Sequence, residues 1–260
     1  MYIKFTKMQG TGNDFVVIAQ FGTDHIDFTK AQIHFLCNRR IGVGADGLMI
    51  LRDHKDSDFE MIYYNSDGNL SSMCGNGGRC IVKYAYDNRF IEEQTSFVAP
   101  DGLHDALVSN ELISLEMKDV ADYASANGVY ILDTGSPHYI TFVNDLEEVD
   151  VKSEGASIRY SPAYRTNGIN VNFVQIIDEN RFKIRTYERG VEDETLSCGT
   201  GVTAAAIASY LETGKSTTHY HIETMGGNLE VQFKLNKKLF TNIKLIGPAE
   251  TVFEGKMLFA

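Results

Sequence analysis

Short apolar and β-branched runs recur along the chain and predict a protein built mainly from strands. Clusters of glycine, asparagine and aspartate separate these runs and favour turns between them. The expected strands are Asp14–Ala19, Leu48–Leu51, Phe59–Tyr64, Leu112–Met117, Tyr139–Val143, Asn172–Ile177, Phe182–Tyr187, Ile222–Thr224, Leu229–Phe233 and Ile243–Ile246.

Three segments carry helical patterns instead. Thr29–Arg39 is amphipathic, and Thr29 is suited to be its N-cap residue. Gly75–Asn88 and Gly199–Thr213 each begin in a glycine-containing turn, and the second contains a run of strong helix formers.

The two halves of the chain resemble each other. Three pairs of motifs occur in the same order, offset by 123, 126 and 124 residues: Thr11–Phe15 with Thr134–His138, Gly42–Asp46 with Gly168–Asn172, and Cys74–Gly77 with Cys198–Gly201. Matches in register at a nearly constant offset indicate an internal duplication of a unit of about 125 residues. We therefore expect an α+β fold with two pseudo-symmetric lobes: residues 1–118, to which 250–260 return, and residues 119–249.

Composition and charge narrow the class of protein. The chain has 260 residues, 43% of them hydrophobic, and lacks an apolar run long enough for a membrane span. Met1–Met8 has no signal-peptide pattern, so we expect a cytoplasmic protein that does not bind a membrane. The net charge of -11 argues against nucleic acid as a partner. A small-molecule substrate fits these properties, and a homodimer is left open.

Two of the four cysteines stand at the predicted starts of helices. Cys74 precedes Gly75-Asn76-Gly77-Gly78, and Cys198 precedes Gly199-Thr200-Gly201. A helix start stabilises a thiolate through the helix dipole, and its free N–H groups can hold a substrate carboxylate. We interpret Cys37 and Cys80, which lie in apolar or helical surroundings, as buried structural thiols.

The duplication suggests what such a pair of thiols does. Pseudo-symmetry would place Cys74 and Cys198 on opposite faces of one substrate carbon. One thiolate could then remove a proton from one face while the other thiol delivers a proton to the opposite face. This chemistry inverts a stereocentre without a covalent intermediate.

Other motifs carry weaker signals. Gly42–Gly47 matches the dinucleotide fingerprint G-x-G-x-x-G, but a helix precedes it and a strand follows it, which is the reverse of the required context. His219 and His221 offer two metal ligands with no third nearby in sequence, so we interpret them as a strand surface and expect neither a metal nor a cofactor.

Asparagines in the glycine-rich loops and a Glu-Arg pair at a strand end are candidates for substrate binding: Asn13, Asn65, Asn76, Asn170, Glu188 and Arg189.

These motifs together resemble the diaminopimelate epimerase family. The matching segments span essentially the whole chain: Met8–Phe15, Arg40–Gly47, Asn65–Gly68, Cys74–Cys80, Gly135–His138, Tyr187–Gly190 and Cys198–Gly201. The resemblance implies interconversion of LL- and meso-diaminopimelate without pyridoxal phosphate, in the synthesis of lysine and cell-wall precursors. It also implies that each lobe is a β-barrel-like sheet around a central helix, with the active site in the cleft between the lobes.

The resemblance assigns roles to individual residues. Cys74 and Cys198 would be the two acid/base groups. The α-carboxylate of the substrate would lie on the helix starts at Gly75, Asn76, Gly199 and Thr200. Further substrate contacts would come from Asn13, Asn65, Asn170, Glu188 and Arg189.

Two departures from the family pattern concern the substrate more than the chemistry. Ser136 stands where asparagine is frequent, and the segment between Gly190 and Cys198 is longer by one residue than in many members. Another cofactor-independent racemase of the same fold, acting on proline or histidine, is therefore an alternative. An isomerase of the phenazine-pathway type and a thiol redox protein are further alternatives.

Overall fold

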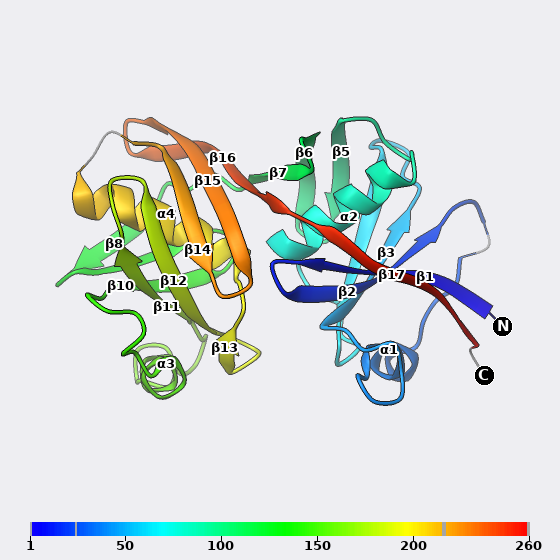
Figure 1. The fold of residues 1–260 in the computed structure, drawn as a ribbon, viewed down its shortest axis with the longest axis horizontal. Helices are drawn as coiled ribbons and strands as arrows, with labels where there is room; N and C mark the ends of the chain where they lie inside the picture. The colour runs from blue at the N-terminus through cyan, green and yellow to red at the C-terminus, as the bar shows by residue number, and fades with distance from the viewer. Residues whose placement is uncertain (1, 24, 215–216, 259–260) are drawn as a thin grey trace. The chain divides into compact units, whose positions relative to one another are not determined.

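The computed structural model describes residues 2–23, 25–214 and 217–258, and the chain divides into two compact units (Figure 1). Unit 1 comprises the residues up to 115 together with those from 248 onward, and unit 2 comprises residues 116–247. The predicted lobes, 1–118 with 250–260 and 119–249, end within three residues of these bounds. Residues 259 and 260 of the predicted returning segment lie outside the described residues.

Unit 1 contains one curved sheet and two helices. Its elements are β1 (Tyr2–Gly10), β2 (Asn13–Gln20), α1 (Lys30–Cys37), β3 (Gly47–Arg52), β4 (Phe59–Asn65), α2 (Gly75–Asp87), β5 (Gln94–Ala99), β6 (Gly102–Ser109), β7 (Leu112–Met117, whose last residues begin unit 2) and β17 (Glu250–Leu258). The strands pair in the order β17-β1-β2-β3-β4-β5-β6-β7. The β2–β3 and β4–β5 pairs are parallel, and the others are antiparallel.

Unit 2 repeats this arrangement. Its elements are β8 (Tyr123–Ala126), β9 (Val129–Asp133), β10 (Pro137–Phe142), α3 (Val151–Arg159), β11 (Asn170–Ile176), β12 (Arg181–Glu188), β13 (Asp193–Thr195), α4 (Gly199–Thr213), β14 (His219–Thr224), β15 (Gly227–Asn236) and β16 (Leu239–Pro248, which leads back to unit 1). The strands pair in the order β8-β9-β10-β11-β12-β14-β15-β16, and β13 adds to β12. The β10–β11 and β12–β14 pairs are parallel, at the same steps as in unit 1. The predicted duplication is therefore confirmed at the level of topology.

The strand registers also align the two units residue by residue. Phe15 pairs with Gly47 in unit 1, and His138 pairs with Asn170 in unit 2, so both strands are offset by 123 residues. The matching of Gly42–Asp46 with Gly168–Asn172 at an offset of 126 was therefore wrong by three residues. The error arose because the match was anchored on Gly42 and Gly168, whereas the strand register fixes the true correspondence.

Each unit wraps its sheet around one long helix, as Figure 1 shows for α2 and α4. Helix α2 packs on β1, β2, β3 and β6, and α4 packs on β9, β10, β11, β12 and β15. Close approach needs glycine at the first turns, since a Cβ at Gly78 would lie 2.9 Å from Leu115, and one at Gly201 would lie 2.5 Å from Asn172. The predicted α+β lobes, each with a central helix, are confirmed.

The predicted helices form, but the pattern missed other elements. Thr29 caps α1 with a capping box completed by Gln32, and both glycine-led helices begin where expected. Helix α3 was missed because its sequence is rich in glycine and serine and buries only Val151 and Gly155. The strands that were missed are β1, β5, β6, β8, β9, β13 and β17, several of which expose most of their residues.

None of the described helices is long and apolar enough to span a membrane.

Gly155 gives a test of the packing of α3. A Cβ at Gly155 would lie 2.4 Å from the Cβ of Tyr187, which is fixed in β12. We expect Gly155→Ala to lower the free energy of unfolding by roughly 1–3 kcal/mol through overpacking, although alanine favours helices more than glycine. Urea denaturation would measure the change. The exposed Ser153→Ala is the control, and a stabilised Gly155→Ala would contradict the packing.

Candidate active site

The first cysteine half-site lies within unit 1, at the start of α2. Cys74 is the N-cap residue, with extended backbone angles of φ -110 and ψ 129. Its carbonyl oxygen accepts a hydrogen bond from the Gly78 amide at 2.7 Å. Its sulfur donates to Asn13 Oδ1 at 3.5 Å, and Asn76 Nδ2 donates to the same oxygen at 3.4 Å. Three of the predicted site residues therefore meet in one cluster.

A hydrogen bond to Asp46 fixes the orientation of the Asn13 side-chain amide. Asn13 Nδ2 donates to Asp46 Oδ2 at 2.6 Å, and a carboxylate can only accept. The carbonyl oxygen of Asn13 must therefore point toward Cys74. An acceptor in that position favours the protonated thiol of Cys74 over the thiolate.

A charged network holds Asp46 in turn. Arg39 bonds Asp46 Oδ1 at 2.8 Å and both oxygens of Asp14 at 2.8 and 2.7 Å. Burial by itself raises the pKa of Asp14, but hydrogen bonds from Arg39 and Lys7 outweigh burial and bring this pKa to about 2. The network therefore stays charged at neutral pH and anchors the loop that carries Asn13.

Arg79, a residue of α2, has a fully buried guanidinium beside the first turn of the helix. Arg79 is 0% exposed and donates to Thr11 Oγ1 at 3.2 Å, Asn76 Oδ1 at 3.1 Å and the carbonyl oxygens of Gly75 and Pro248, each at 3.3 Å. None of these described acceptors is a carboxylate. Burial lowers the pKa of Arg79 to about 10, while the nearby thiols of Cys80 and Cys74 oppose this change. Arg79 remains a cation at neutral pH and reduces the cost of a thiolate at Cys74.

The second cysteine half-site lies within unit 2, at the start of α4. Cys198 is the N-cap residue, with extended backbone angles of φ -120 and ψ 107, and is 9% exposed. Its sulfur lies 3.5 Å from Thr200 Oγ1, which is 2.9 Å from His138 Nε2. The backbone geometry therefore repeats that of Cys74, but the polar partners differ.

A chain of hydrogen bonds runs from Thr186 to Cys198, and each group in the chain donates to the next. Thr186 Oγ1 donates to Asn172 Oδ1 at 2.9 Å, and Asn172 Nδ2 donates to the Tyr139 carbonyl at 3.1 Å, which fixes the Asn172 amide. Nδ2 also faces His138 Nδ1 at 3.1 Å, so Nδ1 must accept. His138 Nε2 then carries the proton and donates to Thr200, whose hydroxyl proton is left to donate to Cys198. A hydroxyl donor in that position favours the thiolate of Cys198.

The imidazole of His138 is held neutral. Burial lowers its pKa to about 3, and the nearby Arg189 acts in the same direction. His138 is 0% exposed. The chain of donors therefore keeps a single tautomer across the physiological pH range.

The other predicted residues of unit 2 gather around Ser136. Asn170 Nδ2 donates to Ser136 Oγ at 2.9 Å and to the Pro137 carbonyl at 3.0 Å, while Asn170 Oδ1 accepts from the Arg189 amide at 2.9 Å. Arg189 Nη2 also donates to Ser136 Oγ at 3.3 Å. The amide of Asn170 is thus committed to protein partners. Ser136 accepts two hydrogen bonds and retains a hydroxyl proton that can face a ligand.

Asn65 and Glu188 occupy equivalent places in the two units, at the last residues of β4 and β12. Glu188 Oε2 accepts a hydrogen bond from Thr195 Oγ1 at 2.9 Å. The side chain of Asn65 is exposed. Gly75 and Gly199 are the buried first residues of α2 and α4. The hydrogen bonds described above join Asn13, Cys74 and Asn76 in unit 1, and Asn170 and Arg189 in unit 2.

The two remaining cysteines differ from these in chemistry. Burial raises the pKa of Cys37 and of Cys80 to about 12. Neither thiol ionises near neutral pH, so neither is a nucleophile or a base there. The loop at Gly42–Asp46 follows α1 and leads into β3, which is the order expected from the sequence and is not that of a dinucleotide site.

Sequence reasoning did not assign roles to Arg79, His138 and Asn172. Each is a buried polar residue. The register aligns His138 with Phe15 and Asn172 with Met49. A polar residue in one copy opposite an apolar residue in the other was the signal available in the sequence. The match of Thr11–Phe15 with Thr134–His138 already contained it for His138, whereas the wrong offset of 126 concealed it for Asn172.

Comparisons with known sequences agree on one family. A family model described as diaminopimelate epimerase matches residues 5–118 and 130–252. A diaminopimelate epimerase from Flavobacterium psychrophilum is 50% identical over 253 residues, which cover 97% of this chain and 99% of that protein. Another from Chlorobaculum tepidum is 40% identical over 258 residues, which cover 95% and 98%.

Solved structures with low sequence identity share the fold. A phenazine biosynthesis protein of the PhzF family from Bacillus anthracis has a TM-score of 0.78 at 14% identity and is matched over the full length of both chains. A probable proline racemase from Agrobacterium radiobacter K84 has a TM-score of 0.68 at 17% identity, with 99% of this chain and 93% of that chain covered.

The donor chain predicts that Thr200 controls the ionisation of Cys198. In a Cys74→Ala background, we expect Thr200→Val to move the pH at which Cys198 becomes alkylated upward by roughly one to two units, because a hydrogen bond to a charged group is lost. Iodoacetamide modification followed by mass spectrometry across a pH series would measure this. Thr200→Ser should restore the profile, and Thr213→Val at the far end of α4 is the control. Coincident profiles for Thr200→Val and its parent would rule out the donor role.

His138 should make the stability of the protein sensitive to acid. Its folded pKa of about 3 lies below the ordinary value of 6.5, so between these pH values only the unfolded state gains the proton. The free energy of unfolding then falls with decreasing pH by up to roughly 1.4 kcal/mol per unit. His138→Phe, which copies the residue of unit 1, should be less stable at pH 7 and should lose this part of the acid dependence.

Urea denaturation at intervals from pH 7 to pH 4 would test this expectation. The difference in stability between the parent and His138→Phe should narrow toward low pH. The exposed His34→Gln is the control and should show no such narrowing. A constant difference for His138→Phe would mean that His138 is protonated in the folded protein.

Proposed function

The chain belongs to the diaminopimelate epimerase family, and from this premise we propose that it interconverts LL- and meso-diaminopimelate. It is an isomerase that moves one proton at the α-carbon, and its product serves the synthesis of lysine and of cell-wall precursors. The observation that carries the proposal is the pair of cysteines. Cys74 and Cys198 cap equivalent helices in the two copies of a duplicated unit, with nearly the same backbone angles.

The different partners of the two cysteines assign their starting roles. Cys198, which faces the hydroxyl of Thr200, begins as the thiolate and removes the α-proton. Cys74, which donates to Asn13, begins as the thiol and delivers its proton to the opposite face. After turnover Cys198 carries the proton and Cys74 is the thiolate, and this form catalyses the reverse reaction. The cation of Arg79 lowers the cost of that second form.

The helix starts stabilise the charge that develops during the reaction. When the α-proton leaves, its electron pair moves toward the substrate carboxylate. The first N–H groups of a helix have no acceptor within the helix and carry its positive end. In the proposal, Gly75, Asn76, Gly199 and Thr200 present such groups to this carboxylate. The negative charge then forms against fixed donors rather than against water, and no cofactor takes part.

The remaining polar residues recognise the rest of the substrate. Glu188 suits an ammonium group, and Arg189 suits a carboxylate. Asn13 and Asn65 add amide contacts from unit 1. Asn170, whose amide is already bonded to Ser136 and Pro137, acts on the substrate by fixing the positions of Ser136 and Arg189. Ser136 offers one hydroxyl proton where an asparagine would offer two amide protons.

A cytoplasmic location stays a prediction, and a homodimer stays an open possibility. The prediction that the substrate binds between the two lobes also stays a prediction, and the proposed mechanism requires that both thiols reach one α-carbon.

Deuterium exchange tests the proposed function most directly. The reduced protein is incubated in D₂O with LL-diaminopimelate, without pyridoxal phosphate, and deuterium and stereochemistry are followed together. We expect deuterium at the α-carbon and formation of the meso isomer. Cys74→Ala and Cys198→Ala should each reduce the rate of inversion by at least roughly 10²–10⁴, because each removes a general acid or base. Inversion at the full rate by either variant would rule out the two-base mechanism.

Parallel incubations separate the alternatives. Exchange into proline or histidine, but not into diaminopimelate, would keep the chemistry and change the substrate. Exchange into none of these amino acids would favour a thiol redox role. Thr213→Val, at the far end of α4, is a matched control that should leave inversion unchanged.

A further inference from the structure

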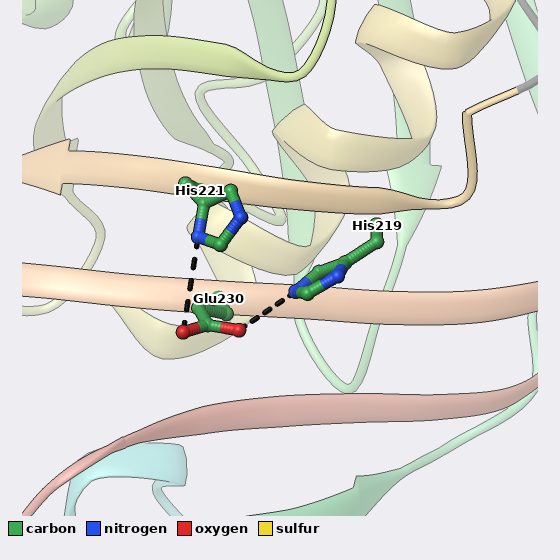
Figure 2. A group of neighbouring side chains, drawn as sticks. All are labelled: His219, His221 and Glu230. Carbon is green, nitrogen blue, oxygen red and sulfur yellow. Dashed lines mark hydrogen bonds and ion pairs between the residues drawn. The ribbon is translucent and has the colours of Figure 1, made fainter.

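Two histidines and a glutamate converge on one face of the β14–β15 hairpin in unit 2. His219 and His221 are two residues apart on β14, so both side chains point to the same face of the sheet. Glu230 is the cross-strand partner of His221 on β15. Figure 2 shows the carboxylate of Glu230 between the two imidazoles. The sequence alone indicated only the two histidines as possible metal ligands. The pairing of β14 with β15 adds Glu230 as the third.

The three side chains are already close enough to share an ion. Glu230 Oε2 lies 2.7 Å from His219 Nε2, and Glu230 Oε1 lies 3.7 Å from His221 Nδ1. One ligand atom from each residue can be chosen so that all three lie within 4.8 Å of one another. Ligand atoms around a tetrahedral Zn²⁺ are separated by roughly 3.3 Å, given metal–ligand bonds of about 2.0–2.1 Å. The two observed separations lie on either side of this value but involve different oxygens of Glu230, so the side chains must rotate to present one ligand atom each to a common ion.

The donor set selects a class of metal ion. Two imidazole nitrogens and one carboxylate oxygen suit Zn²⁺ and other divalent transition metals, whereas Mg²⁺ and Ca²⁺ prefer oxygen ligands alone. Three protein ligands leave at least one position for water or for a group from another molecule. The histidines are about half exposed at the side chain, with relative exposures of 42% and 46%, so an ion can reach them from solvent.

Neighbouring charges permit a cation at this place. Arg181 of β12 lies beside His221 in register, but its guanidinium is bonded to Asp178 at 2.7 Å. Lys183, two pairs further along, lies 3.8 Å from Glu223. Lys244 of β16 is opposite Gln232, which contacts His219 at 3.3 Å. Two of the three nearby cations therefore have carboxylate partners of their own.

The cluster lies on the opposite side of the sheet from α4. Between the histidines, Tyr220 points inward and packs against Phe182 and Phe233 in the core of unit 2, where Phe233 also meets Tyr210 of α4. Because side chains alternate along a strand, His219 and His221 point outward. The cluster is thus separate from the cysteine at the start of α4.

We propose that His219, His221 and Glu230 form a surface site for Zn²⁺ or a similar divalent transition metal. The bound ion ties β14 to β15 through side chains, in addition to the backbone hydrogen bonds of the hairpin. Its open position gives the outer face of unit 2 a place for one further ligand. This inference does not depend on the proposed catalytic function.

Zinc titration of the full chain tests the site. The variant Cys74→Ser/Cys198→Ser is used, so that the reactive thiols do not compete for the metal, and residual metal is first removed with a chelator. Isothermal titration with ZnCl₂ should show one ion per chain. His219→Ala, His221→Ala and Glu230→Gln should each weaken binding by at least roughly tenfold, since even changes behind the ligands cost that much. His25→Ala, which disrupts a surface histidine–aspartate pair without a second histidine, is the matched control.

Two further readouts make the result decisive. Co²⁺ in place of Zn²⁺ should give visible absorption without the charge-transfer band of a thiolate ligand. Zn²⁺ should also raise the melting temperature of the Cys74→Ser/Cys198→Ser variant. It should not raise that of the same variant carrying Glu230→Gln. The absence of saturable binding, or equal binding by the parent, His219→Ala and Glu230→Gln, would overturn the proposal. The deuterium-exchange assay of the proposed function uses the unmodified protein, so its result does not depend on whether the metal site exists.

Discussion

The structure depends on one constraint: the first turn of a buried helix must be surrounded by sheet and still present free N–H groups. In both units this is achieved by a cysteine in an extended conformation at the N-cap, followed by glycine. The cysteine side chain makes no capping bond to its own helix, so the sulfur remains available for other partners. The small residues that follow let the helix approach the strands closely enough to be enclosed. Helix burial and thiol placement therefore both depend on this local geometry.

The two copies satisfy this constraint with different polar groups. Unit 1 uses a buried cation, Arg79, and an amide acceptor, Asn13. Unit 2 uses a neutral imidazole, His138, and a hydroxyl, Thr200. The two copies share the backbone of the helix start, while their buried side chains differ, and the proposed mechanism uses this difference to give the two thiols different protonation states. A reaction that needs one acid and one base benefits from that difference.

The sequence predicted much of this arrangement because glycine turns and cysteines are local features. The starts of α2 and α4 and the cap at Thr29 were predicted correctly, since each depends on neighbouring residues alone. What was missed depends on pairing between strands. Glu230 reaches His221 only through the register of β14 and β15, and the correspondence of Asn172 with Met49 appears only once the strands are aligned. Periodicity within a segment carries no information about such partners.

The return of the chain to unit 1 has a consequence for synthesis. Strand β17 closes the sheet beside β1, and the carbonyl of Pro248 accepts a hydrogen bond from Arg79. A ribosome makes residues 1–115 of this unit before unit 2, but its last strand is made only after unit 2. Unit 2, which is continuous in sequence, can complete its fold earlier. Cys74 is therefore made before Cys198 but waits for strand β17, which follows unit 2 in the chain, before its surroundings are finished.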